Sequence, residues 1–511
     1  MEMETGSVAK RYSQLESERD TFLERGREAA KLTIPTLLPE EGHSSSSIYP
    51  TPYQGIGASG VNNLASKLLL ALLPPNSPFF RLTIDDFDLQ AIAGDNRGQV
   101  EEGLARIERA AMAEIESKAI RVPAFEALKL LIVTGNSLVY MPKEGGMKVY
   151  RPDRYVTKRD TMGNLLEVIT KESLNVLNLP ESVKVLLPES DSPVKNYDLY
   201  TKVCLVDKGW EVYQEVAGIE VPNSRGMFKK DQNPYIPLRF IRIDGEDYGR
   251  GFIEEYLGDL RSLEALTQSI VQGSAASSKV LFLVRPNGTT KSSSLAKAPN
   301  GAFIAGDVND VSTLQVQKAS DFRVALETMR MINDRLSAAF LLNTSVQRQA
   351  ERVTAEEIRF MAQELETSLG GVYSILSQEF QLPLINLLLD SLTKQGKMPR
   401  MPKDSIKPTV VTGIEALGRG QDLNKLATFL QYLQPLGQEI IASEMNVNDY
   451  IDRLAASLGI DTSGLIKSEQ QKMQEQMMMQ QQQQAMLEQQ TVAGMAQGAA
   501  PNLAKAAVEE G

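Results

Sequence analysis

Two arginines, Arg348 and Arg352, are the residues whose type and spacing best suit a chemical task. They lie in the polar stretch NTSVQRQAERV, between two segments with helical apolar spacing. A guanidinium on a loop can bind a phosphate or carboxylate through two parallel hydrogen bonds. Two interpretations stay open. The pair contacts phosphates of DNA or a neighbouring subunit, or it is solvated, with Arg352 in an ion pair with Glu356 at the start of the next helix.

The composition offers few of the residues that nucleophilic or metal-dependent catalysis usually needs. His43 is the one histidine in 511 residues and lies in the polar run EEGHSSSS. Cys204 is the one cysteine, which excludes an intramolecular disulfide and a zinc site built from several cysteines. We therefore interpret His43 as an ordinary loop residue rather than the base of a Ser–His–Asp or Cys–His mechanism.

Two glycine-rich stretches match nucleotide-binding motifs without their context. Residues 55–60, GIGASG, fit G-x-G-x-x-G, but YPTP precedes them where that motif needs a β-strand. We expect a flexible helix start there. In residues 413–420, GIEALGRG, Arg419 replaces the lysine of a phosphate-binding loop and Gly420 replaces the hydroxyl that holds magnesium. Neither stretch predicts a nucleotide site.

Two clusters of acidic residues could bind a cation, but solvated turns explain them more simply. We therefore expect neither a metal nor a cofactor. The two clusters are Asp85, Asp86 and Asp88, and Asp244, Glu246 and Asp247.

The net charge and the lengths of the apolar runs limit the class of protein further. The 54 basic and 65 acidic side chains give a net charge of −11, which disfavours a surface that wraps nucleic acid but suits DNA that passes without sticking. The N-terminus has no apolar signal region. The longest apolar run, residues 68–73, is too short to cross a bilayer. We expect a soluble protein of a reducing cytoplasm, without membrane contact.

The segment after the arginines predicts a long helix that bends. Thr354 suits an N-cap, and apolar side chains recur at helical spacing as far as Leu388. Gly370 and Gly371 interrupt the segment at a cost of about 2 kcal/mol relative to two alanines, and Pro383 removes a further hydrogen bond. We therefore expect Gly370 and Gly371 to form a hinge.

The rest of the chain predicts an α+β fold that is mainly helical. Helices are expected at residues 7–32, 61–73, 100–119, 123–134, 247–278, 321–340, 422–433 and 448–458. Short strands are expected at 137–141, 148–151, 165–170, 196–206, 211–216 and 236–243, with Trp210 in a hairpin core. A strand-and-turn insertion of about 40 residues (280–318) separates two of the helices. The Gln/Met-rich tail from 469 is expected to be disordered, with at most a transient helix.

Several long blocks of the chain resemble the portal proteins, or head-to-tail connectors, of short-tailed, autographivirus-type bacteriophages. They are GASGVNNLASKLLLALLPP, FEALKLLIVTGNSLVY, YGRGFIEEYLGDLRSLEAL, SAAFLLNTSVQRQAERVTAEEIRFMAQELETSLGGVYSILSQEFQLPL and GIEALGRGQDLNKL. The resemblance implies a portal fold, with a wing at 1–247, stem helices at 248–279 and 321–340, and a clip at 280–320. It further implies a channel loop at 341–353, a kinked wing helix at 354–398, a crown at 399–468 and the tail at 469–511.

The resemblance also implies what the protein does. About twelve identical subunits would form a ring (a homododecamer) at one capsid vertex, nucleate head assembly and conduct double-stranded DNA during packaging and ejection, without enzymatic activity. The implied partners are the major capsid and scaffolding proteins, internal core proteins, the terminase large subunit and later the tail adaptor. Arg348 and Arg352 would touch DNA, and the clip would dock partners through Asn287, Lys291 and Lys297. The expected location is the virion, and the host cytoplasm during assembly.

Two other classes remain as alternatives. An ATP-hydrolysing motor or nuclease would need a phosphate loop or a carboxylate cluster in a strand context, which the sequence does not show. A scaffold or internal core protein would form no channel, so imaging of the purified protein would separate it from a ring.

Overall fold

The computed structural model describes residues 7–44, 46–75, 78–84, 97–178, 184, 196–277, 281–314, 319–342, 355–397, 409–413 and 419–436, with short stretches between 445 and 482. The chain divides into two compact units. The first comprises Met1–Gly94 and Leu104–Gln421, and the second comprises Asp95–Gly103 and Asp422–Gly511. Arg348, Arg352 and the carboxylates of residues 85–88 lie outside the described residues.

The core of the first unit is built by helices. They are α1 (Val8–Lys31), α2 (Ile56–Leu72), α4 (Arg97–Ser117, from Leu104 onward), α5 (Arg121–Thr134), α11 (Ala355–Ser368), α12 (Val372–Leu376) and α13 (Leu382–Lys394). One apolar cluster joins them and includes Leu64 of α2, Leu131 of α5 and Leu365 of α11, each 0% exposed. Helix α2 lies at the centre, which explains why its sequence is apolar on several faces.

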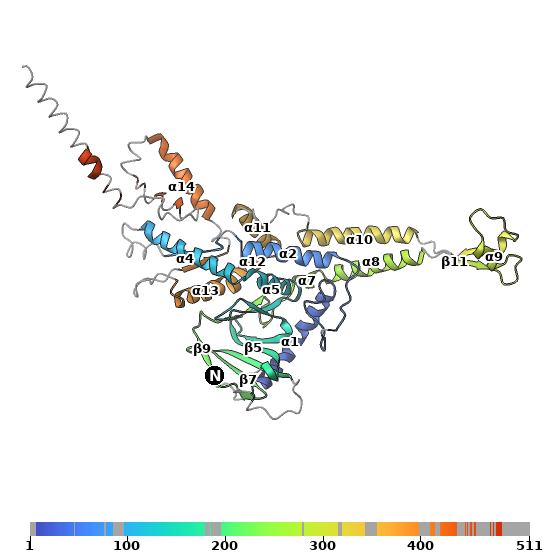
Figure 1. Cartoon of the computed structure of the whole chain (residues 1–511), viewed down its shortest axis with the longest axis horizontal. Coiled ribbons are helices and arrows are strands. Elements are labelled where there is room, and N and C mark those ends of the chain that lie inside the picture. Colours follow the sequence, from blue (N-terminus) through green and yellow to red (C-terminus); the bar gives the residue numbers. More distant parts are fainter. Residues whose placement is uncertain are drawn as a thin grey trace, which may run out of the picture. The chain divides into compact units, whose positions relative to one another are not determined.

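The first unit also contains two antiparallel sheets of three or more strands (Figure 1). The smaller has the order β10 (Tyr235–Arg239), β2 (Asn136–Tyr140), β3 (Lys148–Tyr150). The larger runs β4 (Tyr155–Arg159), β5 (Leu165–Asn175), β6 (Asn196–Val206), β7 (Gly209–Val216), β8 (Ile219–Glu220), and β9 (Gly226–Phe228) pairs with β7. Helix α1 packs on the larger sheet through Tyr12 and Leu15, which cluster with Val156 and Ile169. Mixed helices and strands confirm the α+β class.

One strand pair joins distant parts of the chain. Strand β1 (Phe80–Thr83) is antiparallel to β13 (Thr409–Thr412), although the sequence predicts no strand in either segment. Trp210 is buried in β7 and donates its indole N–H to the carbonyl of Lys230 at 3.0 Å.

A helix pair with a small insertion follows the sheets. It contains α7 (Phe252–Glu255), α8 (Leu257–Ser277), β11 (Leu281–Val284), α9 (Ser292–Lys297), η4 (Val308–Asp310), β12 (Val311–Leu314) and α10 (Ala319–Ala339). The predicted helix start near residue 247 is wrong. Gly249 donates its N–H to Asn136 at 2.7 Å and Arg250 donates to the carbonyl of Ile241 at 2.9 Å, so both are held in the sheet region. The insertion also contains the short helix α9 where turns are predicted.

The expected single bent helix is divided into separate elements. Helix α11 ends at Ser368, and α12 begins at Val372 after Gly370 and Gly371. A π-helical turn, η6 (Ser377–Gln381), then leads into α13. Pro383 stands in the first turn of α13, where a missing N–H costs little. Pro383 therefore lies where the chain changes from a π-helical turn to an α-helix, and the helical backbone does not break there.

The second unit contains α14 (Arg419–Leu433, from Asp422 onward), followed by η8 (Gln434–Leu436). The hydroxyl of Tyr450 donates to the carbonyl of Leu426 at 3.5 Å. Met477 to Gln482 are helical, and most of the predicted helix at 448–458 and of the tail falls outside the described residues. Among the helices that the structure describes, none combines the length and apolar character that a bilayer crossing requires.

Candidate functional site

The α8–α10 pair is antiparallel, and three contacts follow its length. Near the base, the Arg335 guanidinium donates Nε–H to the Asp259 carboxylate at 2.7 Å and a second N–H to its other oxygen. Further along, the Thr267 hydroxyl lies 3.6 Å from the Met329 sulfur. Beyond that, the ring of Phe322 fits against Gly273, where a Cβ atom would lie 2.5 Å from the ring. Small residues on α8 thus permit close approach of α10.

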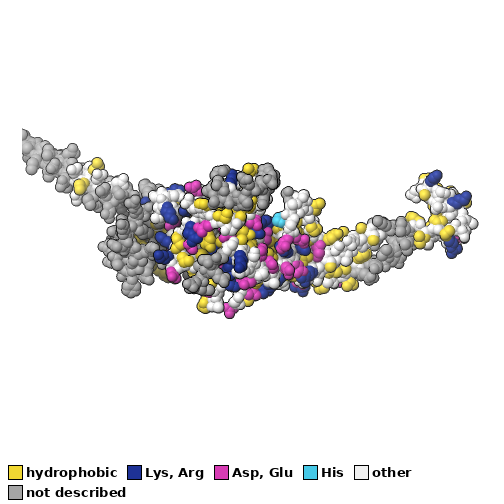
Figure 2. All heavy atoms as spheres, turned by 90° about the horizontal axis from the view of Figure 1, so that it is seen from below, with side chains coloured by type: hydrophobic (Ala, Val, Ile, Leu, Met, Phe, Trp, Pro, Cys, Tyr) yellow, Lys and Arg dark blue, Asp and Glu magenta, His cyan; other side chains and the backbone are white. Residues whose placement is uncertain are grey.

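Both helices of this pair carry large apolar side chains that the chain itself leaves exposed. Val271 on α8 is 51% exposed, and Val324 and Met331 on α10 are 66% and 62% exposed. Residues 265–277 of α8 contain no charged side chain. Figure 2 shows hydrophobic side chains along this part of the molecule. Exposed apolar side chains on both helices, together with the uncharged stretch of α8, make this pair a candidate surface for contact with another protein.

The β11–α9–β12 module at the far end of the pair has a polar interior. Strands β11 and β12 pair from Leu281–Leu314 to Val284–Val311. The buried carboxylate of Asp310 accepts the N–H groups of Thr289 at 2.7 Å and Thr290 at 3.1 Å, and the Thr289 hydroxyl at 3.0 Å. These donors, led by the Thr290 N–H, hold the pKa of Asp310 below its ordinary value. Hydrogen bonds to one carboxylate thus organise a module with little apolar core.

The surface of this module carries exposed basic and apolar side chains. Asn287, Lys291 and Lys297, which the sequence singles out, are all exposed, with Lys291 at the N-cap of α9 and Lys297 in its last turn. Arg285 is also exposed and was missed, although it follows β11 directly. Figure 2 shows Lys and Arg side chains gathered at this end. Several large apolar side chains are exposed beside them: Phe282, Leu283, Phe303 and Val308.

The glycine pair forms a joint that one carboxylate spans. Gly370 and Gly371 have φ of 60° and 88°, in the left-handed region. The Gly371 N–H bonds the Glu366 carbonyl at 3.1 Å, which closes α11. The Glu366 carboxylate accepts the N–H of Ser374 at 3.0 Å and its hydroxyl at 2.5 Å, and so caps α12 in place of the absent side chain of Gly371. Sequence reasoning missed Glu366, because its partner lies beyond the helix break.

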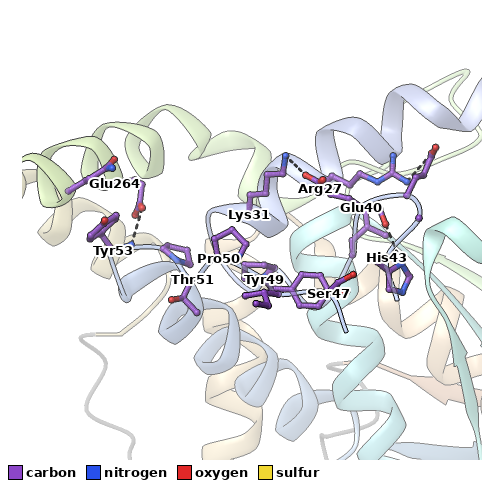
Figure 3. Close-up of a pocket in the computed structure, with 17 residues that line it drawn as sticks. Arg27, Lys31, Glu40, His43, Ser47, Tyr49, Pro50, Thr51, Tyr53 and Glu264 are labelled. Atoms are coloured by element: carbon purple, nitrogen blue, oxygen red, sulfur yellow. Dashed lines mark hydrogen bonds and ion pairs between the residues drawn. The ribbon is translucent and has the colours of Figure 1, made fainter. Parts of the chain in front are cut away.

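A surface pocket of about 760 Å³ lies between the end of α1, the loop at 35–53 and α8 (Figure 3). Its charged groups are already engaged. Lys31 pairs with Glu40 at 2.6 Å, and this contact lowers the pKa of the Glu40 carboxyl. Arg27 pairs with Glu41 at 3.1 Å, and the Nδ1 atom of His43 lies 3.2 Å from the Glu40 carbonyl oxygen. No nucleophile and base are paired among the described lining residues.

Two of the motifs that could have held nucleotides or metals have structural uses, whereas most of residues 413–420 lie outside the described residues. Gly60 packs against Phe340, where a Cβ atom would lie 2.4 Å from the ring, so this glycine permits close contact rather than phosphate binding. Asp247 accepts from Lys158 at 2.9 Å and from the N–H of Arg159 at 2.6 Å. The described residues contain no group of three His, Cys, Asp or Glu side chains suited to a metal.

Comparison with known proteins identifies relatives of this chain. The model of the family described as bacteriophage head to tail connecting protein matches residues 5–466. The portal protein of Escherichia phage T7 is 45% identical over 96% of this chain and 91% of its own length. That of Enterobacteria phage T3 is 45% identical over 90% and 88%, and that of Enterobacteria phage SP6 is 31% identical over 92% and 91%. A solved chain from the neck of a native gene transfer agent particle shows 12% identity over 73% of this chain and 85% of its own, with a TM-score of 0.31, too low to carry an argument.

The family match covers most of the chain, and the portal proteins share their identity with it over nearly their whole lengths. The chain therefore belongs to the family of bacteriophage head to tail connecting proteins, and its function is that of a portal protein.

Proposed function

We propose that about twelve copies of this chain form a closed ring around a channel that conducts double-stranded DNA during packaging and ejection. The observation that carries this proposal is the uncovered apolar surface of the α8–α10 pair. Val271, Val324 and Met331 are each more than half exposed. Covering a side chain of this size contributes about 1.5–3 kcal/mol, and a ring repeats that gain at every interface.

A closed ring suits this surface better than a two-fold dimer. The exposed apolar side chains lie on both helices of a thin pair, on α8 at Val271 and on α10 at Val324 and Met331. A chain with apolar surface on both members of a pair can contact one neighbour through each, which generates a head-to-tail series. The series closes into a ring when the rotation that relates neighbouring subunits is a whole-number fraction of a full turn. A closed ring has no terminal subunit, so no subunit keeps an uncovered apolar surface.

The other parts take the roles that a portal needs. We assign α8 and α10 to the stem, the β11–α9–β12 module to the clip, the helices and sheets before Tyr248 to the wing, and residues 399–468 to the crown. Arg348 and Arg352 would form a cationic collar in a channel of an otherwise acidic protein with net charge −11. Such a collar attracts phosphates locally, while the acidic surroundings limit non-specific adhesion.

We assign different partner contacts to the clip, the wing and the crown. The exposed Lys291 and Lys297 would dock the terminase large subunit and later the tail adaptor. The wing would contact the major capsid and scaffolding proteins, and the crown would contact internal core proteins. The ring itself would be a non-enzymatic conduit at one vertex of the virion, assembled in the host cytoplasm.

The ring is tested by placing charge on the apolar stem face. Val324→Asp with Met331→Asp should abolish rings in negative-stain images and leave a folded monomer by circular dichroism, because both side chains are exposed within one chain. Met162→Asp is the matched control, since Met162 is 77% exposed but lies in the turn between β4 and β5. Intact rings in the stem double variant would refute this interface.

The collar is tested with Arg348→Ala and Arg352→Ala together. Rings should form, but packaged DNA should be translocated more slowly or lost, with the defect largest at high salt, where the remaining attraction is screened. Packaging and retention equal to the unchanged protein at every salt concentration would show that the arginines are only solvated or paired locally.

A further inference from the structure

One face of α2 contacts the end of α10 and, through Lys67, Glu364 of α11. Gly60, Asn63 and Lys67 are spaced by three and four residues, so these positions lie on one face of the helix. Helix α10 ends against this face, and α11 packs on the same helix through the core cluster that contains Leu64 and Leu365. Helix α2 is therefore common to the element before the 343–354 segment and the element after it.

The end of α10 is bound to this face by its carbonyl groups. The amide Nδ2 of Asn63 donates to the carbonyls of Phe340 at 2.9 Å and Leu341 at 3.1 Å. The ammonium of Lys67 donates to the same Leu341 carbonyl at 3.1 Å. The last carbonyls of a helix lack intrahelical donors, so these side chains supply partners that the helix itself cannot.

The backbone held in this way has an uncommon conformation. Leu341 has φ of 53°, in the left-handed region that a bulky side chain rarely adopts. The Leu342 N–H donates to the Ser337 carbonyl at 2.9 Å, so the chain turns sharply at the end of α10. Phe340 is completely buried, and its close contact with Gly60 leaves no room to shift toward α2. Strain of this kind persists where the surroundings determine it.

Lys67 also faces the helix that follows the segment. Its ammonium lies 3.9 Å from the Glu364 carboxylate of α11, and the two side chains are 8% and 23% exposed. Burial lowers the pKa of Lys67, and Glu364 opposes that shift. A buried lysine is costly unless it is partnered, so its position between the Leu341 carbonyl and Glu364 indicates a specific role at this junction.

We propose that Asn63 and Lys67 are positioning residues for the DNA-channel loop. They fix the backbone at Phe340–Leu342, where the chain enters the 343–354 segment, and Lys67 links that point to α11 through Glu364. Arg348 and Arg352 follow this point in the sequence, so Asn63 and Lys67 hold the backbone from which their segment begins. This inference rests on the proposed function of the loop arginines.

The test replaces both residues, Asn63→Ala with Lys67→Met, in the full chain. Two exposed neighbours on the same helix, Asn62→Ala and Ser66→Ala, are the matched controls. Hydrogen–deuterium exchange of peptides containing Leu341 and Leu342 should accelerate by about tenfold in the double variant and stay unchanged in the controls, because lost hydrogen bonds lower the local opening free energy. Asn63→Ala alone, which keeps the buried lysine, should give a smaller increase in the same peptides.

DNA retention separates positioning from general stability. Rings of the double variant should lose packaged DNA as Arg348→Ala/Arg352→Ala rings do, and adding the loop substitutions should cause no further loss. The proposal would be overturned if Arg348→Ala/Arg352→Ala caused the same loss of DNA in the double variant as in the unchanged protein. Unchanged exchange at Leu341 and Leu342 would also overturn it. If Arg348→Ala/Arg352→Ala rings retain DNA normally, the proposed collar is refuted. Accelerated exchange in the Asn63→Ala/Lys67→Met variant would still establish that these two residues hold the backbone at Leu341 and Leu342.

Discussion

Replacement of the glycine pair by alanine probes the joint between α11 and α12. Both glycines have positive φ, and around Gly370 no atom lies within 4 Å of an added Cβ. Alanine at Gly370 therefore meets a conformational cost rather than a collision. An alanine in the left-handed region costs about 1–2 kcal/mol, so the double variant should lose about 2–4 kcal/mol if the joint keeps its shape.

The alternative for this variant is one continuous helix. That change would gain about 2 kcal/mol of helix propensity. It would also move Val372, Tyr373 and Leu376, which are 2%, 0% and 0% exposed, out of the core. Exposing three such side chains costs about 4–9 kcal/mol, and α13 would move with them. We therefore expect the break to persist and the free energy of unfolding to fall by about 2–4 kcal/mol.

Urea denaturation of the full chain, followed by far-ultraviolet circular dichroism, measures this loss at a fixed protein concentration. Gly370→Asn is the matched control and should lose less than Gly370→Ala, since asparagine tolerates left-handed backbone. Rings should still form, and a packaging assay then tests whether the joint acts as a hinge. Unchanged stability together with increased helix content would refute the reasoning, because it would mean that the glycines only interrupt a helix that can straighten.

Three further predictions concern the Asp310 carboxylate, the contact of Gly60 with Phe340, and the C-terminal tail. The hydrogen bonds that lower the pKa of Asp310 stabilise the β11–α9–β12 module above the unfolded-state pKa, and this effect is lost as pH falls through the folded value. The amide protection factor near Thr290, which is corrected for the intrinsic exchange rate, should therefore fall in acid, but not in Asp310→Asn. Gly60→Ala should lower the free energy of unfolding by about 1–3 kcal/mol in urea titrations, because its Cβ would overlap Phe340; an unchanged value would contradict that close contact. Truncation after Ser468 should leave rings intact in negative-stain images, whereas monomers would show that the tail packs between subunits.

Local periodicity was enough to predict most of the secondary structure. Helix α1 at Val8–Lys31 and strand β6 at Asn196–Val206 agree with the expected ranges 7–32 and 196–206 to within a residue. Both elements bury one face against a neighbour, and a buried face leaves a regular apolar spacing in the sequence. The prediction failed near residue 247, because backbone hydrogen bonds to distant residues held the chain in the sheet region.

The sequence by itself also determined the family, through long blocks whose residue order is specific, and its single cysteine excluded an intramolecular disulfide. Tertiary structure alone decided which distant segments meet. The pairing of β1 with β13, the Glu366 cap across the glycine joint, and the contact of Asn63 and Lys67 with Leu341 all join residues whose local patterns carry no record of the partner. The physical reason is that apolar spacing shows which face is buried, whereas the identity of the covering element depends on how the whole chain closes around its core.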